Sequence, residues 1–513
     1  MRTAFMTVLM RKYFSYTPLL LFGLLLAAGW FLPSATLSHF FSDDSFFYLK
    51  IAQNLSLGKG STFDGLNPTN GYHPLYLAWL LLLAGLTTLQ PVQGMYLVWL
   101  SDGLLFLVFL LLLHRFCKEN RLSAAGRWAV LMLCLIFLGL YDFGNEGRLL
   151  LPLAWWLVVR VQQQWRTPTS PLWPLGVLSA LVFLCRLDAV LLPLCLLLPI
   201  FFRRSRLAGA SSARLADGLR LFGPLLAAAL AFTCTNQWLY SSPFTVSSYI
   251  KFGWPGVFAT RWLLTAGISL KARFFFCLIS AAAAAIWLKR RGGRAVNDSF
   301  RLVLSSLAVY ILLYLLILVF WGLGEIRFWY FLLPLVFSFV LWSVWLDRWS
   351  QRRPVLHQPL FTALMIVLLT VLAVAIVHKK ITWSGRRDGW ALAQWIKTNT
   401  PPETRIFQVD GSGVIGYFSE RTVINGDGLV NSWDYQRALQ QGRLHDFLHS
   451  CKVDYLVWNR YREGEKIEIN IPLKNHNGYV LRFTAAPQLR ARFGACVLLC
   501  WDETIAAVTP API

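Results

Sequence analysis

Residues 17–32 read TPLLLFGLLLAAGWFL without a charged side chain, and residues 41–52, shortly after them, read FSDDSFFYLKIA. A transmembrane helix needs roughly 20 largely apolar residues. Basic residues precede the apolar stretch, and the PSAT run that follows it is a poor cleavage site for a signal peptide. We therefore expect residues 17–32 to form an uncleaved first membrane span, with the N-terminus of the chain in the cytoplasm.

The composition of the whole chain is that of a multi-pass membrane protein. Of its 513 residues, 56% are hydrophobic and 14% are charged, and the mean hydropathy is +0.52. A soluble domain usually carries about 25% charged residues, so the composition argues against a soluble globule, a disordered chain or a coiled coil. The formal net charge of +23 would suit nucleic-acid binding, but in a membrane protein excess Lys and Arg collects in cytoplasmic loops.

The basic loops give a consistent topology. If residues 75–89 and 96–113 both crossed the membrane, the basic segment 114–121 would lie outside, so we expect residues 75–89 to lie along the membrane or to re-enter it. Every later cytoplasmic loop is then basic, namely 160–166, 203–206, 289–294 and 348–353. About eleven spans are expected, at 17–32, 96–113, 128–142, 149–162, 172–185, 189–202, 221–240, 272–288, 302–321, 329–346 and 359–377. An odd number of spans places the C-terminus outside the cytoplasm.

The composition changes at residue 379. Residues 379–513 hold 17 Lys and Arg against 13 Asp and Glu, a net charge of +4, which leaves +19 for residues 1–378. A length of 135 residues is normal for one domain. We expect a transmembrane module over 1–378 and a soluble extracytoplasmic α/β domain over 379–513. Its expected helices are 388–398 and 433–439, and its expected strands are 405–409, 455–458, 479–483 and 496–501.

Three of the nine cysteines, Cys451, Cys496 and Cys500, lie in this expected domain. An oxidising compartment allows a disulfide there. Cys496 and Cys500 are four positions apart in an expected strand, about 13 Å, which is too far for them to bridge each other. The sequence leaves open a bridge from Cys451 to either of them, or three buried thiols.

The first expected outer loop, about residues 33–74, carries the strongest candidates for chemistry. Asp43 and Asp44 follow the first span closely and precede an expected surface helix. Ser42 or Asp43 could cap that helix, over residues 44–55. A carboxylate in an apolar site also has a raised pKa, which suits a general base. The two roles are compatible.

The same loop continues NPTNGYHPLY over residues 67–76. Turn-forming residues that end at a proline indicate a rigid feature at the membrane surface. His73 alone would be an ordinary interfacial residue. Beside the carboxylates, it could donate a hydrogen bond to a phosphate or a sugar.

More charged residues gather at the expected outer ends of later spans. Glu146 with Arg148, and Arg186 with Asp188, could be local ion pairs that hold helix ends together. Ionisable residues between apolar spans are also candidates for function. Both interpretations stay open.

Lys251 ends a hydroxyl-rich outer loop over residues 241–251, and Arg327 lies in a second outer loop over residues 325–330. Both could extend to lipid headgroups along the membrane surface. They could instead clamp a phosphate, Arg327 with a two-pronged guanidinium and Lys251 as a point charge. Together with the carboxylates they suggest chemistry on a lipid-linked substrate at the outer membrane surface.

The order of these features resembles the GT-C class of membrane glycosyltransferases, which includes protein O-mannosyltransferases and lipid A aminoarabinose transferases. The resemblance rests on Asp43-Asp44 in the first outer loop and on the TNGYHPL run over residues 69–75. Weaker family patterns are matched at Glu146, 186–188, 243–251 and 327–334. The C-terminal outer domain of one bacterial branch is similar to this chain at residues 395–402, 410–418 and 427–430. The second acid of the pair is often Glu in the class and is Asp44 here, which leaves open which carboxylate is the base.

The resemblance implies transfer of a sugar from polyprenyl phosphate to an acceptor hydroxyl outside the cytoplasmic membrane, by one inverting displacement. Asp43, by analogy, would be the base, and Lys251 and Arg327 would stabilise the leaving phosphate. The remaining candidates for donor or substrate binding are Tyr72, His73, Glu146, Arg148, Arg186, Asp188 and Tyr330. Some members use a divalent ion, and the Asp pair could hold Mg²⁺ or Mn²⁺ with waters.

The expected partners are the lipid-linked donor, membrane lipids and a glycan, lipid or protein acceptor, and no nucleic acid. The sequence does not identify the sugar or the acceptor. A transporter or flippase of lipid-linked sugars would use the same charges for binding alone. Transporters commonly show internal repeats, which this sequence lacks. A non-catalytic scaffold for envelope assembly is the other alternative, and it would tolerate substitution of the two aspartates.

Overall fold

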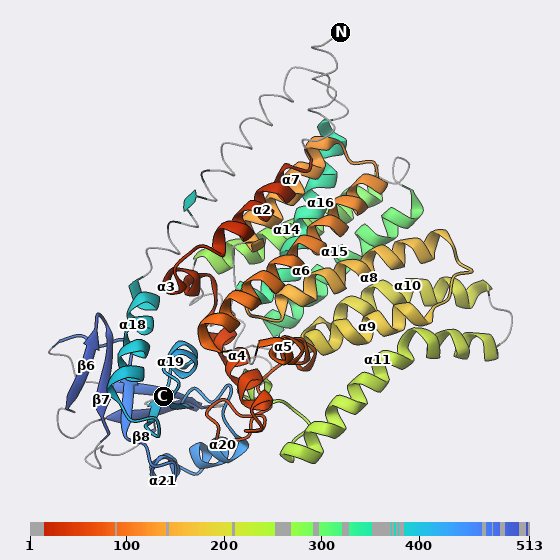
Figure 1. The fold of residues 1–513 in the computed structure, drawn as a ribbon. Helices are drawn as coiled ribbons and strands as arrows, with labels where there is room; N and C mark the ends of the chain where they lie inside the picture. Colours follow the sequence, from red (N-terminus) through yellow and green to blue (C-terminus); the bar gives the residue numbers. More distant parts are fainter. Residues whose placement is uncertain are drawn as a thin grey trace.

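The computed structural model describes residues 15–87, 90–139, 143–207, 211–251, 268–290, 297–320, 328–350, 371, 374–375, 378, 384–463, 468–473, 476–482, 488–501 and 509–510. Most of the helices form one bundle, and the C-terminal domain lies beside α4 at the end of the bundle far from the start of α2 (Figure 1). The bundle helices are α2 (Thr17–Gly29), α6 (Pro91–Glu119), α7 (Ala124–Cys134), α8 (Gly147–Arg166), α9 (Trp173–Cys185), α10 (Leu191–Leu207), α11 (Ser211–Tyr240), α14 (Ile268–Arg290), α15 (Asp298–Phe320) and α16 (Leu332–Ser350). Shorter helices are α3 (Ser34–Leu37), α4 (Asp43–Ser56), α5 (Pro74–Thr87) and α12 (Val246–Lys251).

Within the described residues, each expected span from residue 17 to residue 346 overlaps a helix of this bundle. Four stretches in the described residues are long and apolar enough to cross a membrane: Pro91–Glu119, Ser211–Tyr240, Asp298–Leu318 and Trp329–Arg348. Other apolar helices are shorter, at Thr17–Gly29, Pro74–Thr87, Ala124–Gly139 and Trp173–Cys185. The total of about eleven spans stays a prediction, and the expected span 359–377 lies almost entirely outside the described residues.

One expected loop is helical. Helix α6 continues through residues 114–119, which the charge pattern predicts as part of a basic loop. Phe116 and Cys117 are buried on the inner face of this extension, so packing prolongs the helix past the last apolar run. Asn120 ends it, and its side-chain amide donates to the Phe116 carbonyl at 2.8 Å.

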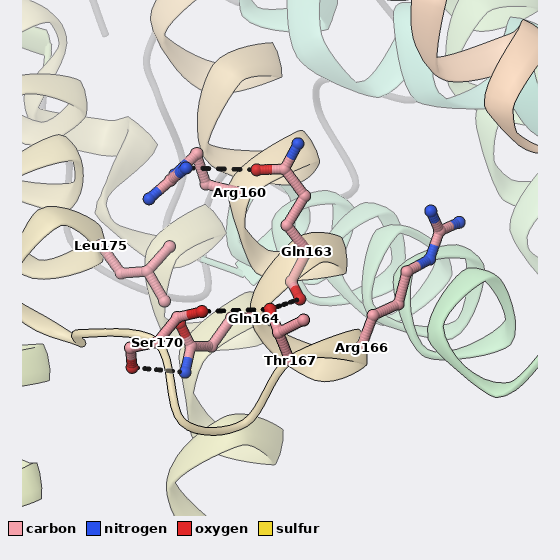
Figure 2. Close-up of a pocket in the computed structure, with 7 residues that line it drawn as sticks. All are labelled: Arg160, Gln163, Gln164, Arg166, Thr167, Ser170 and Leu175. Atoms are coloured by element: carbon pink, nitrogen blue, oxygen red, sulfur yellow. Dashed lines mark hydrogen bonds between the residues drawn. The ribbon is translucent and has the colours of Figure 1, made fainter.

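The ends of several helices meet at one end of the bundle, here called the basic end. The Asn120 amide donates to Gln162 Oε1 at 3.2 Å, and Arg166 Nε donates to Ser299 Oγ at 3.0 Å. Arg348 reaches the Asn120 carbonyl at 3.4 Å. The loop from α8 to α9 lies at this end (Figure 2). The structure therefore brings basic segments that the topology assigns to one side of the membrane into direct contact.

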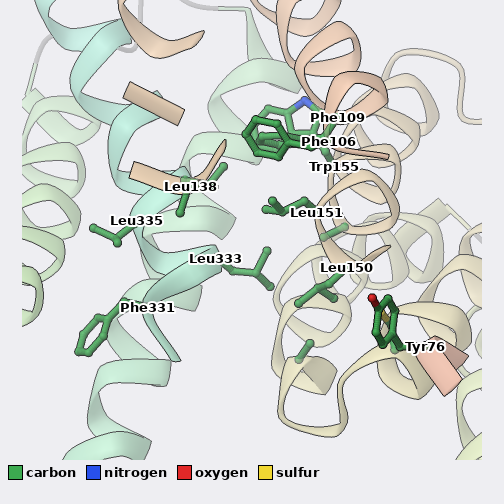
Figure 3. Packing of buried hydrophobic residues seen from close by; sticks show 14 of the residues in the cluster. Tyr76, Phe106, Phe109, Leu138, Leu150, Leu151, Trp155, Phe331, Leu333 and Leu335 are labelled. Carbon is green, nitrogen blue, oxygen red and sulfur yellow. The ribbon is translucent and has the colours of Figure 1, made fainter. Parts of the chain in front are cut away.

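Helix α8 connects the basic end to the opposite end of the bundle. Its 20 residues span about 30 Å. Trp155, near its middle, is fully buried and packs edge-on against Phe109 and Phe116, with ring centroids 6.2 and 5.1 Å away. Leu150 and Leu151 continue the buried surface toward the start of the helix (Figure 3). This packing makes α8 a fixed support for Glu146, which precedes it.

The C-terminal domain is built on a five-stranded sheet of order β2-β1-β3-β7-β6. Strand β1 (Arg405–Gln408) is parallel to both β2 (Thr422–Asn425) and β3 (Tyr455–Trp458). Strand β7 (Cys496–Cys500) is antiparallel to β3 and to β6 (Leu489–Phe493). A second sheet joins β4 (Glu468–Leu473), β5 (His476–Arg482) and β8 (Thr509–Pro510).

Alternate residues of this sheet face two different cores. Phe407 and Ile424 pack in the domain's own core with α20 (Trp433–Gln440) and α21 (Leu444–Ser450). Ile406 and Val423, the preceding positions, belong to the same hydrophobic cluster as the membrane helices, together with α18 (Ser384–Asn399) and α19 (Ser412–Phe418). The predicted mixture of helices and strands in this region is confirmed, and one face of the domain is continuous with the core of the bundle.

All nine cysteines of the chain lie in the described residues and are free thiols. Cys451 and Cys496 are buried and Cys500 is partly exposed. Cys496 and Cys500 are the two ends of β7, as the strand argument required. Of the two alternatives that the sequence left open, the structure has unpaired thiols.

Candidate active site

The acidic pair lies in the first turn of α4. Ser42 is the N-cap residue and forms a capping box with Ser45, whose hydroxyl accepts from the Ser42 N–H at 3.1 Å. Helix α4 therefore starts at Asp43, and the capping residue is the first of the two that we expected. A carboxylate in a first helical turn is stabilised by the positive end of the helix dipole.

Asp43 is bound by the C-terminal domain. The N–H groups of Gly413 and Val414, at the start of α19, donate to its two carboxylate oxygens, each at 3.0 Å. A Cβ atom on Gly413 would lie 2.2 Å from the Asp43 carbonyl oxygen, so only glycine allows this approach. Asp43 thus joins the first outer loop to a segment 370 residues later in the chain.

A third carboxylate, Asp427, lies close to the pair and was not among the predicted site residues. It follows β2, and its Oδ1 accepts from the Leu429 N–H at 2.9 Å. The pKa of Asp427 is raised to about 7, mainly by burial and also by the negative charges of Asp44 and Asp43, while hydrogen bonds from Leu429 and Asn425 oppose the rise. The C-terminal domain therefore presents to the acidic pair a carboxyl group that is partly protonated at neutral pH.

Lys251 lies in the electrostatic field of the same groups. Burial lowers the pKa of its ammonium, but Tyr330, Asp44 and Glu146 raise it by more, so the pKa lies above its usual value. Lys251 therefore stays charged. The structure therefore places Lys251 close enough to Asp44, one member of the acidic pair, for the two charges to interact.

The TNGYHPL run positions the segment that carries Lys251. The Asn70 side-chain amide donates to Asn236 Oδ1 at 2.7 Å and to the Phe244 carbonyl at 3.0 Å, and Asn70 Oδ1 accepts from the Val246 N–H at 2.9 Å. A Cβ atom on Gly71 would lie 1.9 Å from the Leu429 carbonyl oxygen. This run therefore connects α11, the start of α12 and the Asp427 loop, and Asn70 is a positioning residue that the sequence did not single out.

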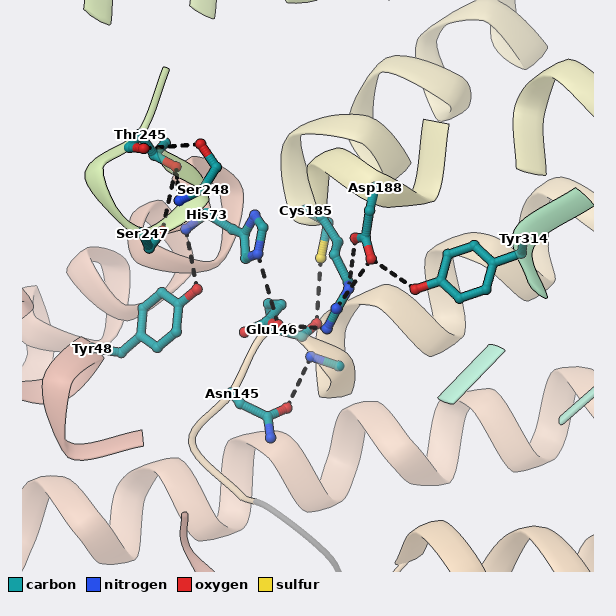
Figure 4. A network of polar contacts seen from close by, with 12 residues as sticks. Tyr48, His73, Asn145, Glu146, Cys185, Asp188, Thr245, Ser247, Ser248 and Tyr314 are labelled. Atoms are coloured by element: carbon teal, nitrogen blue, oxygen red, sulfur yellow. Dashed lines mark hydrogen bonds and ion pairs between the residues drawn. The ribbon is translucent and has the colours of Figure 1, made fainter. Parts of the chain in front are cut away.

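Four predicted residues form one network at the end of the bundle opposite the basic end (Figure 4). Arg186 donates to Glu146 Oε1 at 2.9 Å and grips both oxygens of Asp188, at 2.7 and 3.1 Å. His73 Nε2 lies 3.9 Å from Glu146 Oε1. Tyr314 donates to Asp188 Oδ2 at 2.9 Å. The partner of Glu146 is therefore Arg186 and not Arg148, its neighbour in the sequence.

The loop before α8 holds this network next to α4. Ser45 Oγ donates to the Phe143 carbonyl at 2.6 Å, and the Gly144 N–H donates to the buried carboxylate of Asp102 at 2.7 Å. Gly144 has a φ of +80° and a Cβ there would lie 2.7 Å from Ser45 Cβ, so glycine is needed for both reasons. Glu146, two residues later, is thereby fixed beside the start of α4.

His73 is electrically neutral in this network. Burial lowers the pKa of its imidazole, Arg186 and Lys251 lower it further, and Glu146 opposes them. Its Nδ1 is a buried atom without a hydrogen-bond partner among the described residues. A buried polar atom of this kind costs stability unless a ligand or water satisfies it, so His73 offers one nitrogen to a bound molecule.

Of three other predicted residues, two lie away from this network and one lies against it. Arg148 is buried away from the network, with its guanidinium 4.0 Å from the Phe143 ring centroid and a hydrogen bond to the Gly139 carbonyl at 3.2 Å. The Tyr72 hydroxyl pairs with Ser61 Oγ at 2.8 Å inside the outer loop. Tyr330 does join the network, with its ring centroid 5.2 Å below the Arg186 guanidinium.

Arg327 lies outside the described residues. Among the residues that the structure describes, no group of three or more His, Cys, Asp and Glu side chains could hold a metal ion. The divalent ion at Asp43 and Asp44 stays a prediction.

Comparison with known proteins identifies the fold. Residues 377–500 match a family described as a domain of unknown function, DUF8728. No protein with a curated description matches the chain. The chain is similar to ArnT from Cupriavidus metallidurans bound to undecaprenyl phosphate, with a TM-score of 0.55 and 12% identity, over 97% of this chain and 100% of that one. The same protein in the apo state gives a TM-score of 0.48 and 13% identity, over 96% and 99% of the two chains. The chain has the fold of ArnT, and the predicted helical membrane-protein fold with a C-terminal sheet is confirmed, while the number of spans stays a prediction.

Proposed function

We propose, from an ArnT-like fold with carboxylates and cations gathered at one end, that the chain transfers a sugar from a polyprenyl phosphate to an acceptor hydroxyl at the outer face of the cytoplasmic membrane. The observation that carries the proposal is the docking of the C-terminal domain on the acidic pair, through the Gly413 and Val414 N–H groups on Asp43. Asp427 and Lys251 lie close enough to Asp44 to interact with its charge, beside the Glu146–Arg186 pair. The bound undecaprenyl phosphate of ArnT supports a carrier of this class.

The donor phosphate would bind on the cationic side of the site. Lys251 keeps its charge, and Arg327 would add a guanidinium from its outer loop. His73 Nδ1, which has no partner among the described residues, could bond a phosphate or sugar oxygen. The apolar helices beside the site would hold the isoprenoid tail. A fixed cation at this position would stabilise the charge that grows on the leaving phosphate.

The acceptor hydroxyl would lose its proton to the acidic pair. As its oxygen bonds to the anomeric carbon, the bond from that carbon to the phosphate oxygen breaks, and the electron pair leaves with the polyprenyl phosphate. One displacement of this kind inverts the anomeric configuration. The proton goes to Asp43 or Asp44.

The two aspartates differ in what else they do. Asp43 accepts two backbone hydrogen bonds from the C-terminal domain, so Asp43→Asn would turn an amide NH₂ toward an N–H donor and disturb docking as well as chemistry. Asp44→Asn leaves both of these hydrogen bonds in place. It is the cleaner test of a base in this site.

The experiment measures transfer of labelled sugar from a synthetic polyprenyl-phosphate donor by the purified full chain, with lipid, glycan and protein acceptors. Asp44→Asn should lower the rate by about 10²- to 10⁴-fold, the usual contribution of a general base. Lys251→Ala should lower it by about 10²- to 10³-fold, as for other groups that stabilise developing negative charge. Glu119→Gln, an acid at the basic end paired with Arg115, is the control and should keep full activity.

Full activity in both Asp43→Asn and Asp44→Asn would refute the mechanism. Movement of the intact lipid-linked sugar across a vesicle membrane, without a new glycosidic bond, would favour a flippase. If Asp43 and Asp44 can both be replaced without effect in cells, and the chain neither transfers nor transports the sugar, a scaffold would be favoured.

A divalent ion at the acidic pair is tested in the same assay. Mg²⁺ keeps several waters and needs only one or two carboxylates, so Asp43 and Asp44 could supply the protein ligands. Chelation with EDTA followed by Mg²⁺ or Mn²⁺ should remove and restore activity if the ion is needed. An unchanged rate after chelation would rule it out.

A further inference from the structure

A second polar site lies at the basic end, where α8 meets the loop to α9. A cavity of about 260 Å³ opens there, lined by Arg160, Gln163, Gln164, Arg166, Thr167, Ser170 and Leu175 (Figure 2). We call it the α8–α9 hollow. Helix α8, about 30 Å long, separates it from Glu146, so it is distinct from the proposed active site.

The two arginines of the hollow bond only to neutral groups in the hydrogen bonds of the described residues. Arg160 donates to Gln163 Oε1 at 3.2 Å. Arg166 donates to Ser299 Oγ at 3.0 Å and to Asn120 Oδ1 at 3.4 Å. Arg204, nearby, is by contrast neutralised by Asp217 at 3.1 Å. The hollow therefore carries positive charge that no carboxylate in the described residues cancels.

The lining also supplies hydroxyl groups suited to an anion. Thr167 Oγ1 and Ser170 Oγ lie 3.0 Å apart and bond to each other. Gln164, which is buried, uses its amide on the carbonyls of Pro168 and Ser170 at 3.2 and 3.0 Å, and so fixes the shape of the loop. Guanidinium groups and hydroxyls around a preformed hollow match the oxygens of a phosphate.

The hollow lies at the border between polar and apolar surface. Helix α9 starts just beyond it at Trp173, which is 59% exposed, and Leu175 forms part of the lining. Phe202 on α10 is 58% exposed, and the next residue, Arg203, donates to the Trp165 carbonyl at 2.8 Å. Exposed aromatic residues at helix ends mark the membrane interface, and basic pockets between helices on the cytoplasmic side bind anionic headgroups.

We propose that the α8–α9 hollow binds the phosphate headgroup of an anionic phospholipid from the adjoining leaflet. Arg160 supplies a guanidinium to the phosphate diester beside the Thr167 and Ser170 hydroxyls, Arg166 adds positive charge to the lining, and the acyl chains leave along the apolar surface beside Trp173. A free phosphate shares the headgroup chemistry but lacks the chains. The proposal stands whether or not the chain transfers a sugar.

The test is native mass spectrometry of the delipidated full chain in mild detergent, titrated with phosphatidylglycerol, phosphatidylcholine or inorganic phosphate. Phosphatidylglycerol should bind at least tenfold more tightly than phosphatidylcholine. Both lipids carry the same negative phosphate diester, but the choline cation of phosphatidylcholine makes its headgroup neutral overall. Arg160→Ala/Arg166→Ala should weaken that binding by about tenfold or more, as expected for loss of charged hydrogen bonds. The matched control is Arg115→Ala/Arg214→Ala, which removes two exposed arginines outside the hollow and should leave the affinity unchanged.

Arg166 also bonds to Ser299 and Asn120, so the double variant could fold poorly. Arg160→Glu, which touches only the Gln163 contact, is the second variant and should abolish the preference for phosphatidylglycerol. Equal binding of the two lipids, or an equal loss in the control, would overturn the proposal. Phosphate alone binding as tightly as the lipid would show a small-anion site and would overturn the lipid assignment.

Discussion

Charged side chains are paired with opposite charges at the start of helix α8 and with neutral groups at its end. At its start, Glu146, Arg186 and Asp188 form mutual ion pairs, with side chains that are 12%, 7% and 31% exposed. At its end, Arg160 and Arg166 bond to neutral amides and hydroxyls. The ion pairs at the start of α8 depend on each particular partner residue. The arginines at its end contribute only positive charge and hydrogen-bond donors.

This difference follows from the cost of burial. Taking an ion out of water costs several kcal/mol, and a partner repays the cost only with good geometry and full hydrogen bonding. Arg186 meets that condition with three hydrogen bonds to two carboxylates. Exposed arginines at the basic end pay no such cost, since water and lipid headgroups solvate them. Stability at the start of α8 therefore depends on which residues pair and on their geometry. The basic end depends only on the sign of its charges.

The largest expected effect comes from removing the shared cation. Arg186→Met would leave the buried Glu146 and the half-buried Asp188 without their counter-charge, which costs roughly 3–5 kcal/mol of folding free energy. Thermal or denaturant unfolding of the purified protein in detergent measures the loss. Arg186→Lys keeps the charge but not the two-pronged grip, so its loss should be smaller. A Met variant as stable as the parent would show that the network is not a unit.

A smaller effect is expected from forcing the C-terminal domain off α4. Gly413→Ala places a methyl group 2.2 Å from the Asp43 carbonyl oxygen, and overpacking of this kind costs roughly 1–3 kcal/mol. Limited proteolysis should release the domain faster. Gly389→Ala is the control, since its Cβ would meet only Val414 Cγ1 at 3.9 Å. If both variants resist protease like the parent, Asp43 does not anchor the domain.

The sequence could predict the basic end because that end is set by composition. Counting the sign of charges between apolar stretches is enough to sort the loops, and it located His73, Glu146, Arg186 and Asp188 at the other end. It predicted the local pair of Arg186 and Asp188, which the structure contains, but it did not predict that Glu146 pairs with Arg186. Glu146 and Arg148 are two positions apart in the sequence, but residues two apart on a helix do not face each other, and Arg148 points into the bundle.

The parts of the site that the sequence did not predict are formed by contacts between residues distant in the sequence. Helix α19 has 7 residues, including Gly413 and Gly416, and glycine is a weak helix former. Both glycines are needed for packing, since a Cβ on Gly416 would lie 2.4 Å from Phe63 Cζ. Asp427 precedes Gly428, and Asp-Gly is a common turn signal. The resemblance marks residues 427–430, but the turn pattern alone accounts for Asp427, so the sequence does not place its carboxyl group beside the acidic pair.

The third prediction concerns pH and the third carboxylate. The pKa of Asp427 rises from 3.8 to about 7 on folding, so between these values the folded chain keeps a proton that the unfolded chain releases. Stability should therefore fall as pH rises through this window and stop responding to this group above about pH 7. Asp427→Asn should flatten the parent's slope in a series of melting temperatures. His73 has the opposite sign, because its lowered pKa makes stability fall as pH drops below about 6.5, and the difference between parent and variant isolates Asp427.

The matched control for that series is Asp434→Asn, whose side chain is 71% exposed. It should leave the slope unchanged. An equal slope in the parent and in Asp427→Asn would mean that the carboxyl group of Asp427 stays solvated and ionised, and that the C-terminal domain does not bring a proton to the acidic pair.

The smallest effect is expected at the basic end, from a variant that removes the same charge as Arg186→Met. Arg115→Ala breaks the pair with Glu119 at 2.8 Å, in which the arginine side chain is 70% exposed. Pairs of this i,i+4 type contribute about 0.3–0.5 kcal/mol, and Glu119 remains near solvent without its partner. The unfolding free energy should therefore change by roughly a tenth of the loss in Arg186→Met, and added salt should shrink the change further. A loss in Arg115→Ala as large as that in Arg186→Met would mean that burial does not separate the two ends, because the same charge would then carry the same weight at both.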